Sequence, residues 1–204
     1  MAAAVLTLAL ILSVFVLVFL FFFPLGRGAV YVPSAPRKAV RIARMAGAAP
    51  GQRAADLGSG DGRILIALAR RGAEAHGYEV NPVLMLVSRA AIRRAGLGGR
   101  AFVGPRLPAR VRAGREVLRR PGRSTAGLAV VHWRSFWRAD LSRFDAITLF
   151  QGSFIMRRLE RKIRRELRPG ARVISDFWAF PTLVPETRDG TLYRYRVDQE
   201  DRHS

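Results

Sequence analysis

Cysteine is absent from the 204 residues of this chain, which excludes a disulfide framework, a thiolate zinc site and a cysteine nucleophile. The same absence leaves the redox compartment of the protein undetermined. Lysine is nearly absent too, because Lys38 and Lys162 are the only lysines among 35 basic residues. The histidines, which are His76, His132 and His203, are scattered without the spacing of metal ligands, so no metal site is predicted.

Acidic residues are also few, and 15 of them against 35 basic residues give a formal net charge of +20. A field of this sign attracts polyanions, which points either to the anionic lipid of a cytoplasmic leaflet or to nucleic acid. A third interpretation requires no ligand, because arginine can occupy solvated positions where any long polar side chain would serve. The charge alone does not decide among the three.

The N-terminus lacks polar residues, since residues 2–24 contain only two polar side chains, Thr7 and Ser13. As a helix, about 23 residues rise roughly 34 Å, which is enough to cross the hydrocarbon core of a bilayer. A cleaved signal peptide is the alternative, but this run is longer, has no basic start and ends without a small-x-small cleavage site. We therefore expect a transmembrane anchor over residues 1–26.

The distribution of basic residues around this run predicts its orientation. None precedes the run, whereas several follow within about 20 residues, and basic flanks stay on the cytoplasmic side. We therefore expect a single-pass membrane protein with a cytoplasmic folded domain and the lipid bilayer as a partner. The same basic residues also fit an ordinary solvated helix face. They are Arg27, Arg37, Lys38, Arg41 and Arg44.

The chain divides into three predicted parts. The anchor at 1–26 is followed by a basic linker and helix at 27–50, and then by one folded domain at 51–200. Within the domain, residues 103–126 are rich in arginine and proline and read as an insertion. Such a segment is either a mobile loop or a basic arm for lipid or RNA.

A glycine-rich turn begins the folded domain. Residues 54–63 read as a short strand, a tight turn with Gly58, Gly60 and Gly62, and the start of a helix that continues through the apolar run 64–69. Glycines at these positions let the backbone approach a ligand closely, and the free N–H groups of the following helix point toward it. The turn therefore predicts a ligand-binding site.

The spacing around the turn narrows the ligand. The third glycine comes one residue too early for the dinucleotide fingerprint G-x-G-x-x-G, and the Lys-Ser/Thr of a triphosphate-binding loop is missing. Glu79 ends the next predicted strand, 23 residues beyond Asp56, where a carboxylate can bind both hydroxyls of a ribose. We expect an adenosine-containing ligand without a pyrophosphate. The alternative is a structural turn with a surface glutamate.

The remaining hydrophobic patterns alternate between helices and strands. Helices are expected over 83–95 and from 155 to 167, the second with apolar residues at steps of four. Strands are expected over 128–132, 144–150, 171–175 and 191–197. The sequence therefore predicts an α/β fold, a Rossmann-like sheet with helices on both faces, preceded by one transmembrane helix.

Three segments of the chain resemble a known family. They are similar to segments of class I S-adenosylmethionine-dependent methyltransferases. The segments are D-L-G-S-G-D-G-R-I at 56–64, G-Y-E-V-N-P at 77–82 and V-Y-V-P-S at 30–34. The branch that they resemble contains the mitochondrial lysine methyltransferases of the ATP synthase c-subunit and of the adenine nucleotide translocase. The likeness covers most of residues 1–102 and 128–197.

The resemblance implies a cofactor and a set of binding residues. The cofactor is S-adenosyl-L-methionine, and the family has an acidic residue followed by an aromatic one after the third strand. Ser135 replaces the acid here, while Phe136 or Trp137 can still stack on an adenine. The cofactor-binding candidates are Asp56, Gly58, Ser59, Gly60, Asp61, Gly62, Glu79, Asn81, Ser135 and Phe136.

The expected reaction is methyl transfer, most simply to a protein lysine at or near the membrane, with a membrane protein as the substrate. Gln151 and Asp176, at the ends of the fourth and fifth strands, are candidates to position the amine, and Tyr31 is a candidate to close the pocket. Alternatives are a methyltransferase for a small lipophilic molecule or RNA, and a nucleotide-binding membrane module without chemistry. Nucleic acid is the less favoured partner.

Overall fold

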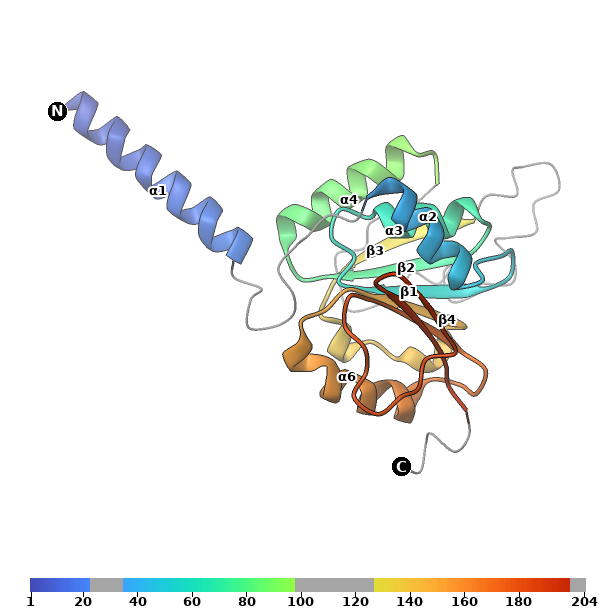
Figure 1. The fold of residues 1–204 in the computed structure, drawn as a ribbon. Coiled ribbons are helices and arrows are strands. Elements are labelled where there is room, and N and C mark those ends of the chain that lie inside the picture. The colour runs from blue at the N-terminus through green and yellow to red at the C-terminus, as the bar shows by residue number, and fades with distance from the viewer. Residues whose placement is uncertain (23–34, 98–126, 199–204) are drawn as a thin grey trace.

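The computed structural model describes residues 1–22, 35–97 and 127–198, and over these the domain is a sheet covered by helices on both faces (Figure 1). The strands are β1 (Arg53–Leu57), β2 (Glu74–Glu79), β3 (Leu128–Trp133), β4 (Ala146–Leu149), β5 (Arg172–Asp176), β6 (Thr187–Asp189) and β7 (Leu192–Arg196). The helices are α1 (Ala2–Phe22), α2 (Pro36–Met45), α3 (Arg63–Arg70), α4 (Pro82–Arg94) and α6 (Ser153–Glu166), with the 3-10 turns η2 (Phe136–Arg138) and η3 (Leu141–Arg143).

The seven strands follow the order β3-β2-β1-β4-β5-β7-β6. Strands β1 to β5 pair in parallel, whereas β7 is antiparallel to β5 and β6 is antiparallel to β7. The strand order reverses between β1 and β4, and open α/β sheets bind ligands beyond the carboxyl ends of the strands at this point. Leu57 is level with Tyr78 of β2 and with Leu149 of β4, so these three strands end side by side.

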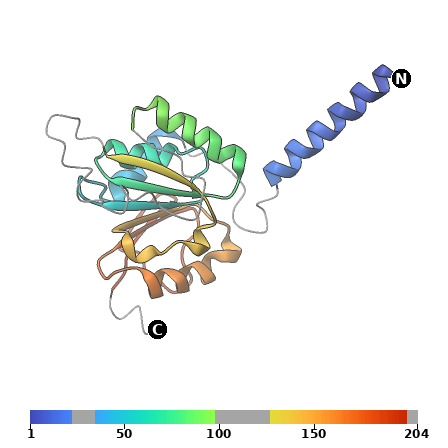
Figure 2. The ribbon, with the colours of Figure 1, turned by 180° about the vertical axis from the view of Figure 1, so that it is seen from behind.

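Helices lie on both faces of the sheet (Figures 1 and 2), and a hydrophobic core fills the space on each face. Helices α2, α3 and α4 contribute to one core, which includes Ala54 and Ile174 from the strands. Helix α6 and the turns η2 and η3 contribute to the other, which includes Ala55 and Val173. Neighbouring residues of one strand thus point to opposite faces, and both faces are buried, which explains the nearly continuous apolar strands.

Local sequence fixes the helix ends that surround the site. Asn81 caps α4, because its Oδ1 accepts hydrogen bonds from the backbone N–H groups of Val83 and Leu84. Prolines at the first helical position begin both α4 and α2. Gly170, with φ of 83°, forms the turn between α6 and β5.

Most of the predicted elements are present within a residue or two. Helix 83–95 corresponds to α4, strand 171–175 to β5 and strand 191–197 to β7. The predicted strand 144–150 is shorter, because β4 begins only at Ala146 and Phe144 belongs to the core below it. Strand β6 was not predicted, since three residues are too few for an alternating pattern. The insertion at 103–126 lies outside the described residues, and the division at 27–50 and 51–200 stays a prediction.

The predicted transmembrane anchor requires a correction. Within the residues that the structure describes, no helix is long and apolar enough to cross a membrane. The prediction of a single-pass membrane protein with a cytoplasmic domain is therefore wrong, and the bilayer as a partner has no support.

Packing of α6 against the sheet provides a test of this fold. Leu159 is completely buried in the core beneath α6, whereas Arg161 on the same helix is exposed. We expect Leu159→Ala to lower the free energy of unfolding by about 2 to 5 kcal/mol, because the truncation leaves a cavity in a packed core. Arg161→Ala should change it by less than about 0.5 kcal/mol. Urea unfolding measures both, and equal effects of the two substitutions would contradict the packing.

Candidate functional site

The glycine turn between β1 and α3 has the conformation that its sequence predicts. Gly58, Gly60 and Gly62 have φ values of 92°, 53° and 82°, a region that strains other residues. A Cβ at Gly58 would lie 2.5 Å from Nε2 of Gln151, and one at Gly62 would lie 2.3 Å from Oγ of Ser88. Neither position has room for a side chain, so the backbone of the turn forms the surface of the site.

Glu79, at the end of β2, is tied to this turn. Its Oε2 accepts a hydrogen bond from the N–H of Gly60 at 2.8 Å, and its Oε1 accepts from Val80 at 2.9 Å and Asn81 at 2.8 Å. Burial raises the pKa of Glu79, and the three backbone donors oppose that rise. A carboxylate has about four acceptor sites, so these bonds fix its orientation and leave acceptor capacity for a ligand.

Asp56, the penultimate residue of β1, lies beneath the turn and is 2% exposed. Burial raises its pKa to about 7, and the nearby carboxylates of Glu79 and Asp61 add to the rise. Thr148 of β4 donates a hydrogen bond to Oδ1 at 2.8 Å, which acts in the opposite direction. Oδ2 of Asp56 and Oγ of Ser59 are buried without a hydrogen-bond partner among the described residues. Unpartnered buried polar atoms are costly, and a bound ligand can supply the missing partners.

Two of the predicted binding residues have structural partners that account for their side chains. Asn81 caps α4 as described above, and it is 3% exposed. Asp61 binds Arg63 at the start of α3 through contacts of 2.5 to 3.2 Å. Asp61 lies in the turn and Asn81 begins α4, and any contact that they make with a ligand stays a prediction.

Two aromatic residues lie at or just after the carboxyl end of β3, Trp133 and the predicted Phe136, and the contact of Phe136 with an adenine stays a prediction. Phe136 is 5% exposed and packs on Trp137 in the core, while Ser135 accepts a hydrogen bond from the N–H of Trp137 as the cap of η2. Trp133 is 47% exposed, is level with Glu79 in the sheet, and donates its Nε1–H to the carbonyl of Val80. The exposed ring near Glu79 is therefore that of Trp133.

The carboxyl ends of β4 and β5 bring two of the predicted catalytic residues to the same edge. Gln151 is 3% exposed, and its Nε2 donates to the carbonyl of Leu57 at the end of β1. Asp176 is 2% exposed and accepts a hydrogen bond from Oγ1 of Thr191 at 2.7 Å. Nζ of Lys38, from α2, lies 2.6 Å from Oδ2 of Asp176. The third predicted catalytic residue, Tyr31, lies outside the described residues.

Sequence reasoning missed three residues of this edge. Thr148 lies inside a predicted strand, and nothing in the pattern marks it as the partner of Asp56. Trp133 directly follows the predicted strand end at 132, so a strand one residue longer would have placed it opposite Glu79. Lys38 carries a signal that the basic cluster around it obscures, since it is one of two lysines in an arginine-rich chain.

In the three described stretches, no group of His, Asp and Glu side chains has the arrangement of a metal site. The polar groups around the turn suit a different ligand. They are backbone N–H groups, a fixed carboxylate at Glu79 and a buried acid at Asp56 with one unpartnered oxygen. Such groups bind hydroxyls and a cationic group, which matches a nucleoside attached to an ammonium-bearing tail.

Comparison with known proteins agrees with this geometry. No family model matches the chain. It is 31% identical over 156 residues to the lysine N-methyltransferase of the ATP synthase c-subunit from Xenopus laevis, covering 76% of this chain and 56% of that protein. It is 28% identical over 163 residues to the adenine nucleotide translocase lysine N-methyltransferase of Mus musculus, covering 79% and 58%. The chain thus spans a little over half the length of these relatives.

A solved structure matches more completely. The RNA methyltransferase of Salinibacter ruber, crystallised with S-adenosyl-L-homocysteine, superposes with a TM-score of 0.64 at 25% sequence identity, covering 82% of this chain and 95% of that one. The resemblance predicted from the sequence is therefore confirmed, as is the Rossmann-like methyltransferase sheet.

The raised pKa of Asp56 predicts how stability depends on pH. Asp56 holds its proton up to about pH 7 in the folded protein but only up to about pH 3.8 when unfolded. The folded state binds the extra proton in this window, so this residue makes the free energy of unfolding fall as pH rises through it. Asp56→Asn cannot ionise. We expect its stability relative to the wild type to increase between about pH 4 and pH 8, measured by urea unfolding. A difference that stays constant with pH would exclude the buried-acid interpretation.

Proposed function

We propose that this chain, which has the fold of class I S-adenosylmethionine-dependent methyltransferases, binds S-adenosylmethionine and methylates the ε-amino group of a protein lysine. One observation carries the proposal. The carboxyl edge of the sheet combines a glycine turn that has no room for side chains with two buried carboxylates, Glu79 and Asp56, that retain acceptor capacity.

The residues around the turn would contact different parts of S-adenosylmethionine. Glu79 is held by three backbone N–H groups in a fixed orientation and would accept the ribose hydroxyls. Asp56 has a buried Oδ2 without a partner and would face the cationic part of the ligand. A positive charge near Asp56 favours its ionised form, so binding would reverse the pKa rise that burial causes. The exposed ring of Trp133 offers an apolar surface beside Glu79.

When bound, S-adenosylmethionine supplies an electrophilic methyl group. The protein then has to hold a nucleophilic amine in line and keep water out, and orientation of this kind is worth roughly 7 to 11 kcal/mol. Gln151 and Asp176 are the proposed positioning residues, because they lie on adjacent strand ends beside the turn. An amine beside the Asp176 carboxylate can pass its proton to that group or to water before it attacks.

The substrate class rests on two observations. The curated relatives described above are named as lysine N-methyltransferases that act on the ATP synthase c-subunit and the adenine nucleotide translocase. In this chain an amine already lies 2.6 Å from the buried Asp176, so the edge can hold an ammonium group. A protein lysine therefore fits better than an uncharged acceptor.

RNA is the second candidate substrate. The superposed Salinibacter ruber protein is named an RNA methyltransferase, and the net charge of +20 attracts polyanions. Against it, the acceptor edge presents buried carboxylates, which repel phosphates.

Cofactor binding is tested at Glu79. Glu79→Gln removes charge from the ribose acceptor while keeping its size, so we expect the affinity for S-adenosylmethionine to fall by at least about tenfold, the effect of losing about 1.4 kcal/mol. Calorimetric titration measures the loss. The control is Glu186→Gln, the same change at a glutamate that pairs with arginines away from this site. This variant should bind S-adenosylmethionine as the wild type does. Unchanged affinity in Glu79→Gln would refute the assignment of the site.

The acceptor is tested with radiolabelled S-adenosylmethionine and a cell extract. We expect the label to survive ribonuclease and to be released by acid hydrolysis as methylated lysine. Label that ribonuclease removes would instead establish RNA as the substrate.

A further inference from the structure

Asp176 combines three features that a purely structural ion pair does not require. It is 2% exposed and ends β5, at the edge of the sheet where the proposed acceptor binds. Its two oxygens have separate partners, Oγ1 of Thr191 at 2.7 Å and Nζ of Lys38 at 2.6 Å. The hydroxyl orients the carboxylate, and the amine occupies the remaining oxygen.

The residue after Asp176 is strained. Phe177 has φ of 75°, the only positive φ of a non-glycine residue in the described part of the chain, and such a conformation persists only where the surrounding structure maintains it. The backbone N–H of Phe177 donates a hydrogen bond to the carbonyl of Thr191 at 2.8 Å. The hydroxyl of Ser175 donates a second one to the carbonyl of Trp178 at 2.6 Å. The structure thus maintains a strained conformation beside the acid.

Two aromatic side chains that follow Asp176 are exposed. Phe177 is 54% exposed and Trp178 is 40% exposed, and their rings meet edge to face at 5.1 Å. Aromatic faces attract ammonium groups, including methylated ones, so an exposed pair next to a buried carboxylate suits a methyl-accepting amine.

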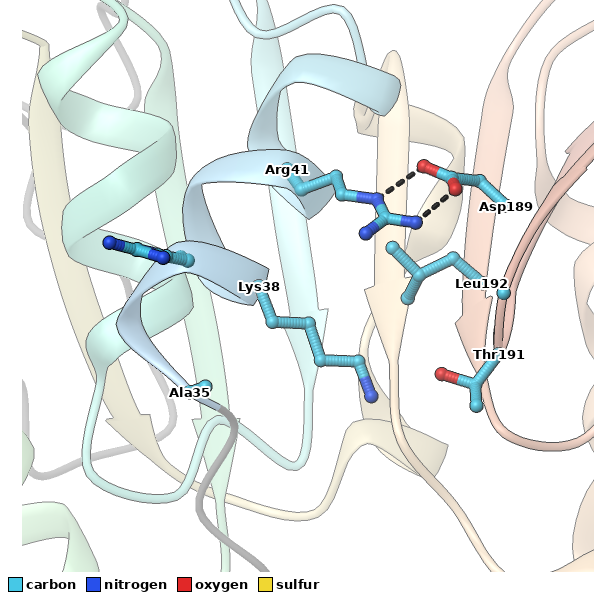
Figure 3. A pocket seen from close by; sticks show the side chains of 8 residues that line it. Ala35, Lys38, Arg41, Asp189, Thr191 and Leu192 are labelled. Carbon is cyan, nitrogen blue, oxygen red and sulfur yellow. Dashed lines mark hydrogen bonds and ion pairs between the residues drawn. The ribbon is translucent and has the colours of Figure 1, made fainter.

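Lys38 reaches this acid from helix α2. Its side chain is 32% exposed and lines a pocket of about 350 Å³ between α2 and the β6–β7 turn. Figure 3 shows Lys38 extending toward Thr191, while Arg41, one turn further along α2, points to Asp189 and binds it. The two basic residues on this side of the helix therefore have separate acidic partners.

The residue type at position 38 matters for chemistry. The chain has 35 basic residues, and all except Lys38 and Lys162 are arginines. An arginine would make the same ion pair, but its guanidinium does not lose a proton in proteins, whereas a lysine can become a nucleophile. Lys162 lies on the other face of the sheet, bound to Glu166 and to the carbonyl of Ala139.

From these observations we infer that Lys38 is a self-methylation site, in which the chain's own amine occupies the position of a substrate lysine at Asp176. The inference rests on the proposed function. In the reaction, a proton leaves Nζ of Lys38 for the Asp176 carboxylate and then for water. The lone pair of Nζ forms the bond to the methyl carbon, and the electrons of the broken carbon–sulfur bond return to sulfur, which gives S-adenosylhomocysteine. Methylation keeps the positive charge, so the ion pair persists.

The first experiment maps the modification on the full chain. Purified protein is incubated with S-adenosylmethionine, digested and analysed by mass spectrometry. We expect one to three added methyl groups on Lys38, none on Lys162, and loss of the label in Lys38→Arg and in Asp176→Asn. The labelled fraction should grow at a rate independent of protein concentration, because each amine lies on its own Asp176. No label on Lys38, or a rate proportional to concentration, overturns the inference.

A matched control moves the lysine by one turn. The double variant Lys38→Arg with Arg41→Lys keeps a lysine on the same side of α2 but opposite Asp189. We expect no label at position 41, since Asp176 is then paired only with an arginine. Equal labelling at position 41 would mean that exposure alone selects the amine, and would overturn the role of Asp176.

A binding measurement tests the proximity without turnover. S-adenosylmethionine carries a positive sulfonium and S-adenosylhomocysteine does not. If Lys38 lies beside the transferred methyl, Lys38→Met should bind S-adenosylmethionine several-fold more tightly, with unchanged affinity for S-adenosylhomocysteine. Equal changes for both ligands overturn the inference. Failure of the proposed function looks different, because wild-type protein would then bind neither ligand. If the wild type binds S-adenosylmethionine and labels lysines of other proteins but not its own Lys38, the inference alone is refuted.

Discussion

The burial of Asp56 beneath the glycine turn is the constraint around which the site is arranged. A carboxylate placed there needs partners, and the sheet supplies only one, Oγ1 of Thr148. Its pKa rises to about 7, which reflects a folded state that holds an ionised acid poorly. At Gly58 and Gly62 of the turn, Gln151 and Ser88 pack so closely that only glycine fits. Stability is thus lower here than a packed apolar core would give, as is usual for functional sites.

The sequence predicted the parts of this site that depend on local pattern. The glycines, Asp56 and Glu79 lie on a strand, a turn, a helix and a second strand that follow each other directly, and each element has its own signal. The partners that come from distant strands were not predictable. Thr148 is 92 residues from Asp56, and only the pairing of β4 with β1 brings the two together. Two further residues of the site were visible in the sequence but could not be interpreted without the sheet register. Trp133 comes one residue after the predicted end of its strand, and Lys38 is one of only two lysines in the chain.

The apolar composition of the N-terminal run led to the prediction of a membrane anchor that the structure does not support. The uninterrupted apolar pattern does produce a helix, α1 (Ala2–Phe22), as its residues favour. A helical pattern predicts the conformation of a segment, but it does not decide whether that helix lies in a membrane. Within the described residues no membrane-crossing helix is found, so the proposal for the acceptor rests on the edge of the sheet instead of on tethering.

The distribution of charge favours an amine over a polyanion as the acceptor. The chain as a whole is strongly positive, yet buried acids gather at the carboxyl edge of its sheet, with Asp56, Glu79 and Asp176 each at most 7% exposed. Buried charges act at a lower effective dielectric than the arginines on the exposed face of α6, so each buried acid interacts more strongly with a nearby charge. A phosphate backbone would have to bring its negative charge against them, whereas a lysine ammonium replaces Lys38 in a contact that the fold already makes. In the proposed function, the same local field would favour the cationic cofactor over its neutral product. Methyl transfer from a sulfonium to an amine therefore fits an edge whose acids are fixed before either partner arrives.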